Sequence, residues 1–326
     1  MKRVCVSKVL LTGATGFVGR ALVAELLRRD KTVVAAVRKL APNLPTDVHQ
    51  EVVGNLSSNT EWGSALQNID VVIHLAARVH IMDDSAADPL TEFRKVNTEG
   101  ALKLARQSAD AGVKRFIFLS SIKVNGEMTV PGQPFQPNDN YIPTDPYGLS
   151  KYEAEQGLLA IAKQTGMEVV IIRPPLVYGP DVKANFSSMM KWVNKGLPLP
   201  FGAIHNQRSF VALDNLVDFI IHCIDHPKAA NEVFLISDGE DVSTTQLLQK
   251  VAKAFAKKPM LIPVPVCLMT FVAKLVGKGD VANRLFGSLQ VDSSKARDLL
   301  GWKPIITMDE QLKKTAEAYL EHEKII

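Results

Sequence analysis

The sequence predicts an α/β protein in which a doubly wound parallel sheet is joined by a smaller, interleaved C-terminal domain. Short β-branched and apolar runs alternate with helical stretches through the first half of the chain, a pattern typical of a parallel sheet covered by helices on both faces. The run Val71–Ile73 is apolar at every position, as expected of a strand buried on both faces. After Arg173 the alternation stops and the chain becomes rich in Pro, Gly and Asn. A second domain is therefore expected to begin there.

The elements of the first half follow in order from local hydrophobic patterns. The expected strands share clustered β-branched residues and are Val9–Thr12, Thr32–Val37, Val48–Val53, Val71–Leu75, Phe116–Ser120 and Val169–Arg173. The expected helices lie between them, at about Gly16–Arg29, Thr60–Leu66, Leu90–Ala111 and Pro146–Thr165.

The second half predicts one further strand and a mostly helical remainder. The run Val233–Ile236 has the composition of a strand that returns to the sheet, and the chain from about Asp241 onward alternates helical stretches with Pro-rich joints. The first domain is therefore expected to comprise residues 1–173 and about 207–239. The second is expected to comprise about 174–206 and 240–326.

Composition excludes several classes of function. The net charge is +4 without a run of Lys or Arg, which argues against nucleic-acid binding. The three cysteines are far apart and form no CxxC pair, so neither a disulfide framework nor a metal site is expected, and the cytoplasm is the expected compartment. The apolar stretch Met260–Val276 is interrupted by Pro263, Pro265 and Lys274, so no membrane span is expected. We expect a buried or ligand-facing helix there.

A glycine-rich turn after the first strand indicates a dinucleotide site. The sequence Gly13-Ala14-Thr15-Gly16-Phe17-Val18-Gly19 lies between a strand and a helix, the arrangement that binds a pyrophosphate in Rossmann folds. The spacing is GxxGxxG. The candidate cofactor contacts are Gly13, Thr15, Gly16, Phe17, Val18, Gly19, Arg38, Leu56, Leu75, Ala76 and Ala77, together with Tyr147 and Lys151.

The end of the second strand indicates which dinucleotide is favoured. NAD-specific sites place an Asp or Glu there to bind the ribose 2′-hydroxyl, whereas this chain has Arg38 and Lys39. A guanidinium pairs well with a 2′-phosphate. NADP(H) is therefore the favoured cofactor, with NAD(H) as the alternative.

Tyr147 and Lys151 form a YxxxK pair that predicts a reactive centre. Residues four apart share one face of a helix, and an ammonium near a phenol is expected to lower the pKa of the phenol. Such a tyrosine can exchange a proton with an alcohol while hydride moves to or from a nicotinamide. Ser121, after the strand Phe116–Ser120, is the candidate for binding the substrate oxygen, and Ser120 is its competitor.

These residues together resemble the extended short-chain dehydrogenase/reductases, and within them the branch of nucleotide-sugar enzymes similar to UDP-glucose 4-epimerase. The resemblance spans nearly the whole chain. Its motifs are GxxGxxG, His74–Ala77, Ser121, the YxxxK pair, Arg173-Pro174, Val177–Pro180, Arg208–Asn215 and Asp292–Trp302.

The resemblance implies roles for individual residues. Ser121, Tyr147 and Lys151 would form the catalytic triad, and Asn97 would have a structural role. Arg208 and Arg284 would bind the two phosphates of the nucleotide. Asn185 and Phe186 would line the nucleotide pocket. The helices Leu90–Ala111 and Pro146–Thr165 would form a homodimer interface.

Departures from the family pattern reduce the number of candidate reactions. Ser121-Ile122-Lys123 replaces the Thr-Asp-Glu of the dehydratase branch, and Asn125 replaces the tyrosine that many epimerases carry. The leading hypothesis is therefore NADPH-dependent reduction of a UDP-4-keto sugar. UDP-sugar 4-epimerisation is the close alternative. Reduction of another small ketone, as in dihydroflavonol reductases, and a catalytically silent NADP-binding scaffold or sensor are the others.

Two histidines were considered for catalysis or metal binding. His74 ends an apolar strand, where packing is the simpler role, and His80 begins the loop Val79–Ala87, which also holds Asp83 and Asp84 and has the position of a flap over the substrate. Neither has a spacing that indicates a metal site.

Overall fold

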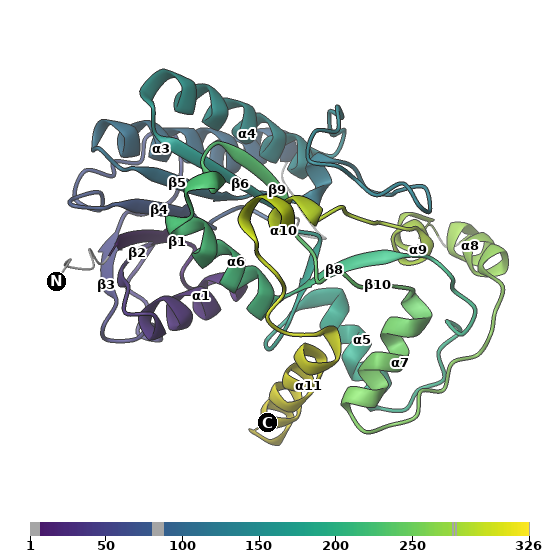
Figure 1. Cartoon of the computed structure of the whole chain (residues 1–326). Helices are drawn as coiled ribbons and strands as arrows, with labels where there is room; N and C mark the ends of the chain where they lie inside the picture. Colours follow the sequence, from purple (N-terminus) through teal and green to yellow (C-terminus); the bar gives the residue numbers. More distant parts are fainter. Residues whose placement is uncertain (1–6, 80–87, 276, 278, 326) are drawn as a thin grey trace.

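The computed structural model describes residues 7–79, 88–275, 277 and 279–325 and contains a seven-stranded sheet beside a three-stranded one (Figure 1). His80, Asp83 and Asp84 lie outside the described residues, so the predicted flap is left as a prediction.

The larger sheet has the strand order β3-β2-β1-β4-β5-β6-β9, and every neighbouring pair is parallel. Its strands are β1 (Lys8–Thr12), β2 (Thr32–Val37), β3 (His49–Val52), β4 (Val71–His74), β5 (Arg115–Leu119), β6 (Glu168–Arg173) and β9 (Glu232–Leu235). The order reverses between β1 and β4, and ligands bind in such sheets at the carboxyl ends of the strands beside this reversal. The predicted doubly wound fold is confirmed.

Helices cover both faces of this sheet (Figure 1). On one face, α1 (Phe17–Arg28) and α6 (Leu213–Asp225) bury residues such as Leu22 and Phe219. On the other face, α3 (Ala101–Asp110) and α4 (Pro146–Thr165) bury Leu104 and Leu158. Strands enclosed in this way have no polar face, which explains their continuous apolar sequences.

The smaller unit is built around the sheet β10-β8-β7. Its strands are β7 (Leu176–Tyr178), β8 (Arg208–Ala212) and β10 (Asp241–Val242). Its helices are α5 (Ala184–Asn194), α7 (Thr244–Ala254), α8 (Val266–Leu275), α9 (Gly279–Phe286) and α11 (Met308–Ile325), while α10 (Ser294–Leu300) packs beside β9. Residues 207–239 are predicted to belong to the first domain, but β8 pairs with β7 and β10. The domain boundaries stay a prediction.

Three element predictions differ from the structure. No helix forms at Thr60–Leu66; the segment is a series of turns in which Trp62 is fully buried. The helix predicted at Leu90–Ala111 consists of α2 (Pro89–Phe93), the π-helix η1 (Arg94–Gly100) and α3 in succession. Within the stretch Met260–Val276 only Val266–Leu275 forms a helix, α8, and none of the residues of α8 is buried. Among the described residues no helix is long and apolar enough to cross a membrane.

Candidate active site

The glycine-rich turn brings β1, α1 and the exit of β4 into close contact. Gly13 has φ +75°, and a Cβ there would lie 2.8 Å from the backbone nitrogen of Ala76. A Cβ on Gly19 would lie 2.0 Å from the carbonyl oxygen of Gly13. Only glycine fits both positions, because the contacts are with backbone that cannot move aside.

The first turn of α1 is free to bind an anion. The N-cap of the helix is Gly16, which supplies no side-chain hydrogen bond, and the first turn holds no acidic residue. Thr15 and Gly16 are exposed, and Phe17 and Val18 are half-buried. Unpaired N–H groups and the positive end of the helix dipole favour phosphate at such a site. The cradle therefore fits the pyrophosphate of a dinucleotide.

The other predicted cofactor residues lie at the same edge of the sheet. Arg38 follows β2 and is exposed, and Leu75, Ala76 and Ala77 follow β4. The backbone N–H of Ala76 donates to the Thr12 hydroxyl at 3.2 Å, which ties the exits of β4 and β1 together. Leu56 follows β3 and lies beside Gly100 of η1. These residues surround the cradle from neighbouring strands.

Ser120 and Ser121 have different partners. The Ser120 hydroxyl is buried and donates to the Glu155 carboxylate at 2.5 Å. Ser121 is the N-cap of the short helix η2 (Ile122–Val124), where its hydroxyl accepts from the backbone N–H of Lys123 at 3.3 Å. It also lies close enough to Tyr147 to lower the pKa of that phenol. Only Ser121 is therefore placed to share a substrate oxygen with Tyr147.

Burial controls the protonation of Tyr147 and Lys151. Burial raises the pKa of Tyr147 to about 12, and the hydrogen bond from Ser121 opposes this only in part. Burial also lowers the pKa of Lys151 to about 7. The Lys151 ammonium donates to the Leu119 carbonyl at 2.9 Å and lies 4.4 Å from the centre of the Phe118 ring. The expectation that Lys151 lowers the pKa of Tyr147 is therefore wrong for this structure, because desolvation dominates and the ammonium is bonded elsewhere.

A buried polar network lies next to the candidate reactive centre, and it was not predicted from the sequence. Arg173 of β6 forms an ion pair with Glu155 of α4 at 2.5 Å, and both side chains are buried. Arg173 also donates to the side-chain oxygen of Asn125 at 2.9 Å. The signal available in the sequence was the spacing of Lys151 and Glu155, which puts a second charged side chain one turn further along the apolar face of α4.

Asn97 connects three segments around the site. Its side chain accepts from the backbone N–H of Arg78 at 2.8 Å and donates to the Arg78 carbonyl at 3.0 Å. It also donates to the Ser150 hydroxyl at 3.1 Å. Asn97 lies in the π-helix η1, whose wide turn directs it inward; such turns are frequent at functional sites. These bonds hold the chain after β4 against α4.

His74 is uncharged and packed in the core. The Thr12 hydroxyl is hydrogen-bonded to Nδ1 of His74 at 2.8 Å, and the same oxygen accepts from the backbone N–H of Ala76. Burial lowers the pKa of His74 to about 3, and the nearby Lys151 charge acts in the same direction. Among the described residues no group of three or more His, Cys, Asp or Glu residues is placed to bind a metal ion.

The two candidate phosphate-binding arginines lie close together. The Arg208 guanidinium donates to the backbone carbonyls of Arg284 and Gly287 at 2.8 and 2.9 Å. No carboxylate of the described residues pairs with Arg208, and burial lowers its pKa. Its backbone bridges to Leu289, whose side chain packs against Ile122, the residue after Ser121. The pair therefore lies near the reactive centre.

Asn185 and Phe186 are placed differently from each other. Both belong to the first turn of α5, where the Asn185 side chain is exposed. Phe186 is buried and stacks on Tyr178 at a centroid distance of 5.7 Å. Phe186 is thus part of the core of the smaller unit.

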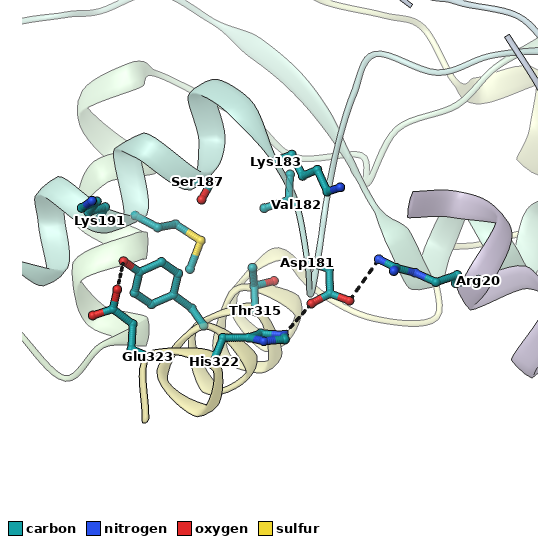
Figure 2. A pocket seen from close by; sticks show the side chains of 11 residues that line it. Arg20, Asp181, Val182, Lys183, Ser187, Lys191, Thr315, His322 and Glu323 are labelled. Carbon is teal, nitrogen blue, oxygen red and sulfur yellow. Dashed lines mark hydrogen bonds and ion pairs between the residues drawn. The ribbon is translucent and has the colours of Figure 1, made fainter. Parts of the chain in front are cut away.

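A separate surface cavity of about 500 Å³ lies between α1, α5 and α11 (Figure 2). At one side of it, Asp181 is bonded to both Arg20, at 3.3 Å, and His322, at 2.8 Å. The cavity contains none of the residues predicted for the active site. The candidate reactive centre therefore lies at the sheet edge, outside this cavity.

The fold and the glycine cradle are typical of dinucleotide-binding proteins, and Ser121, Tyr147 and Lys151 form the candidate reactive centre at the same sheet edge. Residues 9–237 match the NAD dependent epimerase/dehydratase family, and the chain belongs to that family. The chain is 54% identical to a UDP-glucose 4-epimerase of Vibrio cholerae over 96% of its own length and 95% of that protein.

Two further relatives cover the whole chain. A 4-epimerase of Escherichia coli O157:H7, acting on N-acetyl-alpha-D-glucosaminyl-diphospho-ditrans,octacis-undecaprenol, is 27% identical over 97% of this chain and 96% of that protein. The crystal structure of a Thermotoga maritima UDP-glucose 4-epimerase with UDP-glucose superposes with a TM-score of 0.75, at 25% identity, covering 97% of this chain and 99% of that one.

Proposed function

We propose that this protein is a UDP-sugar 4-epimerase. The observation that carries the proposal is the placement of Ser121 beside Tyr147 at the carboxyl edge of the sheet, together with the Gly13–Gly19 cradle at the same edge. The similarity to the Vibrio cholerae enzyme over nearly the whole chain supports C4 inversion above the reduction favoured by the sequence motifs alone. The missing epimerase tyrosine at Asn125 is explained by a structural role, since Asn125 holds Arg173.

The residues divide the work of the reaction between binding and proton transfer. A dinucleotide held by Gly13–Gly19 would supply hydride acceptance and return at C4. Tyr147 takes the proton of the C4 hydroxyl as the ketone forms and returns it after the sugar has presented its other face. Ser121 holds the same oxygen through a hydrogen bond. Arg208 and Arg284 hold the diphosphate, so that the sugar can turn without leaving the site.

Reduction of a 4-keto sugar by NADPH is the second candidate, and two observations favour it. Tyr147 has a pKa of about 12 and so keeps its proton at neutral pH, which suits donation to a ketone. Arg38 is exposed after β2, where no acidic residue opposes a 2′-phosphate. The family description favours NAD, so a comparison of KM for NADH and NADPH bears directly on this choice.

Incubating the purified protein with UDP-glucose and with a UDP-4-keto-6-deoxy sugar separates the candidates. Inversion at C4 without net change in the cofactor supports epimerisation, whereas stoichiometric NADPH consumption with the keto sugar supports reduction. The pH profiles differ in shape. Epimerisation begins with Tyr147 deprotonated, so its rate is expected to rise with pH towards about 12. Reduction begins with Tyr147 protonated, so its rate is expected to stay level with pH and to fall only as the pH approaches about 12.

Tyr147→Phe tests the acid–base role in either reaction. We expect kcat to fall by about 10²–10⁴-fold, the usual contribution of a positioned general acid or base. Affinity for the UDP-sugar should be nearly unchanged, because the phosphates are held elsewhere. A Tyr147→Phe protein that kept full activity would exclude the mechanism and leave the silent scaffold or another ketone substrate as alternatives.

The proposal also includes an oligomeric state and a cellular compartment. We propose a homodimer through the outer faces of α3 and α4, and sedimentation equilibrium of the full chain tests it. The cytoplasm stays the expected compartment, consistent with Cys223 being buried as a free thiol whose pKa is raised by burial.

A further inference from the structure

The helix α8 presents an apolar stripe to solvent. Leu268, Phe271, Val272 and Leu275 are 53%, 60%, 50% and 71% exposed. Their spacing is i, i+3, i+4 and i+7, which places them along one side of the helix. Figure 1 shows α8 at the outer edge of the smaller unit. Contiguous exposed apolar residues of this kind mark an interaction site.

The opposite side of α8 accounts for its attachment to the molecule. Val266, Met269, Thr270 and Ala273 have the same spacing and are partly buried, and α8 packs against α9. No residue of α8 is fully buried. The outward stripe therefore contributes nothing to the core. Polar residues at these four positions would be equally compatible with the fold.

The segment of the sequence that contains α8 is basic. Residues 257–286 hold five basic residues and one acidic residue, so this segment has a net charge of +4, equal to that of the whole chain. The rest of the chain is electrically balanced. The charged residues of the segment are Lys257, Lys258, Lys274, Lys278, Arg284 and Asp280; Lys278 lies outside the described residues and contributes here by sequence alone.

We propose that α8 docks on the surface of an anionic lipid bilayer. Apolar residues along one side of a helix with lysines beside them are typical of helices that lie in the plane of a membrane interface, and anionic lipids attract basic segments. Lysine is depleted from the cores of protein–protein interfaces, yet Lys274 lies between Phe271 and Leu275 in the sequence. A stripe of four side chains is also small beside the roughly 800 Å² per partner of a stable protein interface.

Membrane docking of α8 would place the candidate sugar-diphosphate site close to a bilayer, whichever reaction that site catalyses. α9 follows α8, and the Arg208 guanidinium donates to the backbone carbonyls of Arg284 in α9 and of Gly287. A bilayer contacting α8 would therefore lie close to the candidate diphosphate-binding arginines. This inference concerns where the site operates, and vesicle binding tests it independently of any activity.

Vesicle co-sedimentation of the full chain tests the proposal. We expect the protein to sediment with phosphatidylglycerol–phosphatidylethanolamine vesicles and only weakly with phosphatidylcholine vesicles. Phe271→Glu should reduce the partition coefficient by about tenfold or more, since it removes a large apolar side chain and adds a negative charge. Ile305→Glu is the matched control, because Ile305 is 61% exposed and lies in the bend before α11, outside α8; it should bind as the parent does.

Lys274→Gln separates the electrostatic part of the interaction. It should weaken binding to phosphatidylglycerol vesicles severalfold, less so at high salt, and leave binding to phosphatidylcholine unchanged. Equal binding of the parent and Phe271→Glu would overturn the proposal, as would equal binding to both lipid compositions. If Phe271→Glu instead converted an oligomer to monomers in sedimentation equilibrium, with no vesicle binding by the parent, the occupant of α8 would be a second copy of the chain.

Discussion

Neighbouring serines at the end of β5 have separate tasks, and single substitutions should separate them. Ser121→Ala removes the partner of Tyr147, so kcat is expected to fall by about 10–100-fold, the size of a few kcal/mol of lost transition-state hydrogen bonding. Ser120→Ala leaves the buried Glu155 carboxylate short of a donor. It should lower the free energy of unfolding by about 1–3 kcal/mol. Steady-state kinetics and urea unfolding of both variants check the division; a reversal of the two effects would reassign the catalytic serine.

Lys151 should make the stability of the protein depend on pH. Its pKa is about 7 in the folded chain and ordinarily 10.5. Below pH 7 both states carry the ammonium, and the folded state bears the full cost of burying it. Between pH 7 and 10.5 the unfolded chain binds the extra proton, so stability rises with pH.

A Lys151→Met variant lacks this titration and isolates it. We expect the variant to be more stable than the parent at pH 6, by on the order of 3 kcal/mol, and the advantage to shrink as the pH approaches 10. Thermal unfolding of both proteins across this range measures the difference, in which the other titrating groups largely cancel. A difference that did not change with pH would show that Lys151 keeps its ordinary pKa.

The shared helix face of Tyr147 and Lys151 could be predicted from the sequence, but the pKa values of the two side chains could not. The i and i+4 spacing of Tyr147 and Lys151 predicts that they share a helix face, and both do lie on α4. Their pKa values depend on desolvation by side chains from other elements, such as Phe118 of β5 below Lys151 and Phe93 of α2 against Tyr147. No local pattern encodes these contacts.

At the scale of elements, the ion pair between Glu155 and Arg173 joins α4 to β6. Arg173→Met would leave a carboxylate without its cation in a fully buried position. We expect the free energy of unfolding to fall by about 3–5 kcal/mol. The double variant Glu155→Met and Arg173→Met should recover most of this loss, because no unpaired charge is left. Urea unfolding of the single and double variants measures the coupling free energy between Glu155 and Arg173. An Arg173→Met variant whose free energy of unfolding lay within about 1 kcal/mol of the parent would contradict this prediction.

Strand positions in the larger sheet were predictable because continuous apolar runs indicate burial on both faces. The strands β1, β2 and β6 agree with their predicted ranges within a residue at each end. The segment Thr60–Leu66 has helical composition, but burial of Trp62 and the hydrogen bond from the Trp62 backbone N–H to the side-chain oxygen of Gln107 hold the segment in turns. Tertiary contacts of this kind override local propensity.

At the scale of the whole molecule, Asp238 and Asn215 connect the two sheets and the C-terminal segment. Asp238 follows β9 and accepts from the Tyr178 hydroxyl of β7 at 2.7 Å and from the Ala212 backbone N–H of β8 at 2.8 Å. Asn215 donates to Asp238 at 2.7 Å and accepts from the backbone N–H groups of Ile305 and Ile306.

Asn215→Ala should loosen this connection. Several buried polar groups would lose their partner at once, so the free energy of unfolding is expected to fall by about 3 kcal/mol. Asp309→Ala is the control, because Asp309 forms only partly exposed ion pairs with Lys250 and Lys253 and should cost less than about 1 kcal/mol. Hydrogen exchange should speed up first around Ile305 and Ile306 in Asn215→Ala; unchanged protection there would contradict the assigned role.

The two-sheet architecture was only partly predictable. The change of composition after Arg173 indicates where the second unit begins, since Pro- and Gly-rich sequence does not continue a helix–strand alternation. The pairing of β8 with β7 joins segments about thirty residues apart in the chain. Such pairing depends on the packing of both against α5, α7 and α11, which no single-segment pattern reports.

The π-helix η1 also has a genetic consequence. Its wide turn accommodates extra chain between α2 and α3, so a one-residue deletion within 94–100 would shorten the segment to an ordinary α-helix. Because the wide turn absorbs the extra residue, α2 and α3 would keep their relative orientation, and only the side chains within 94–100 would change direction. Asn97 would then point away from Arg78 and Ser150. Reading-frame-preserving deletions should therefore be tolerated poorly here, even though the shortened helix itself would be the more regular one.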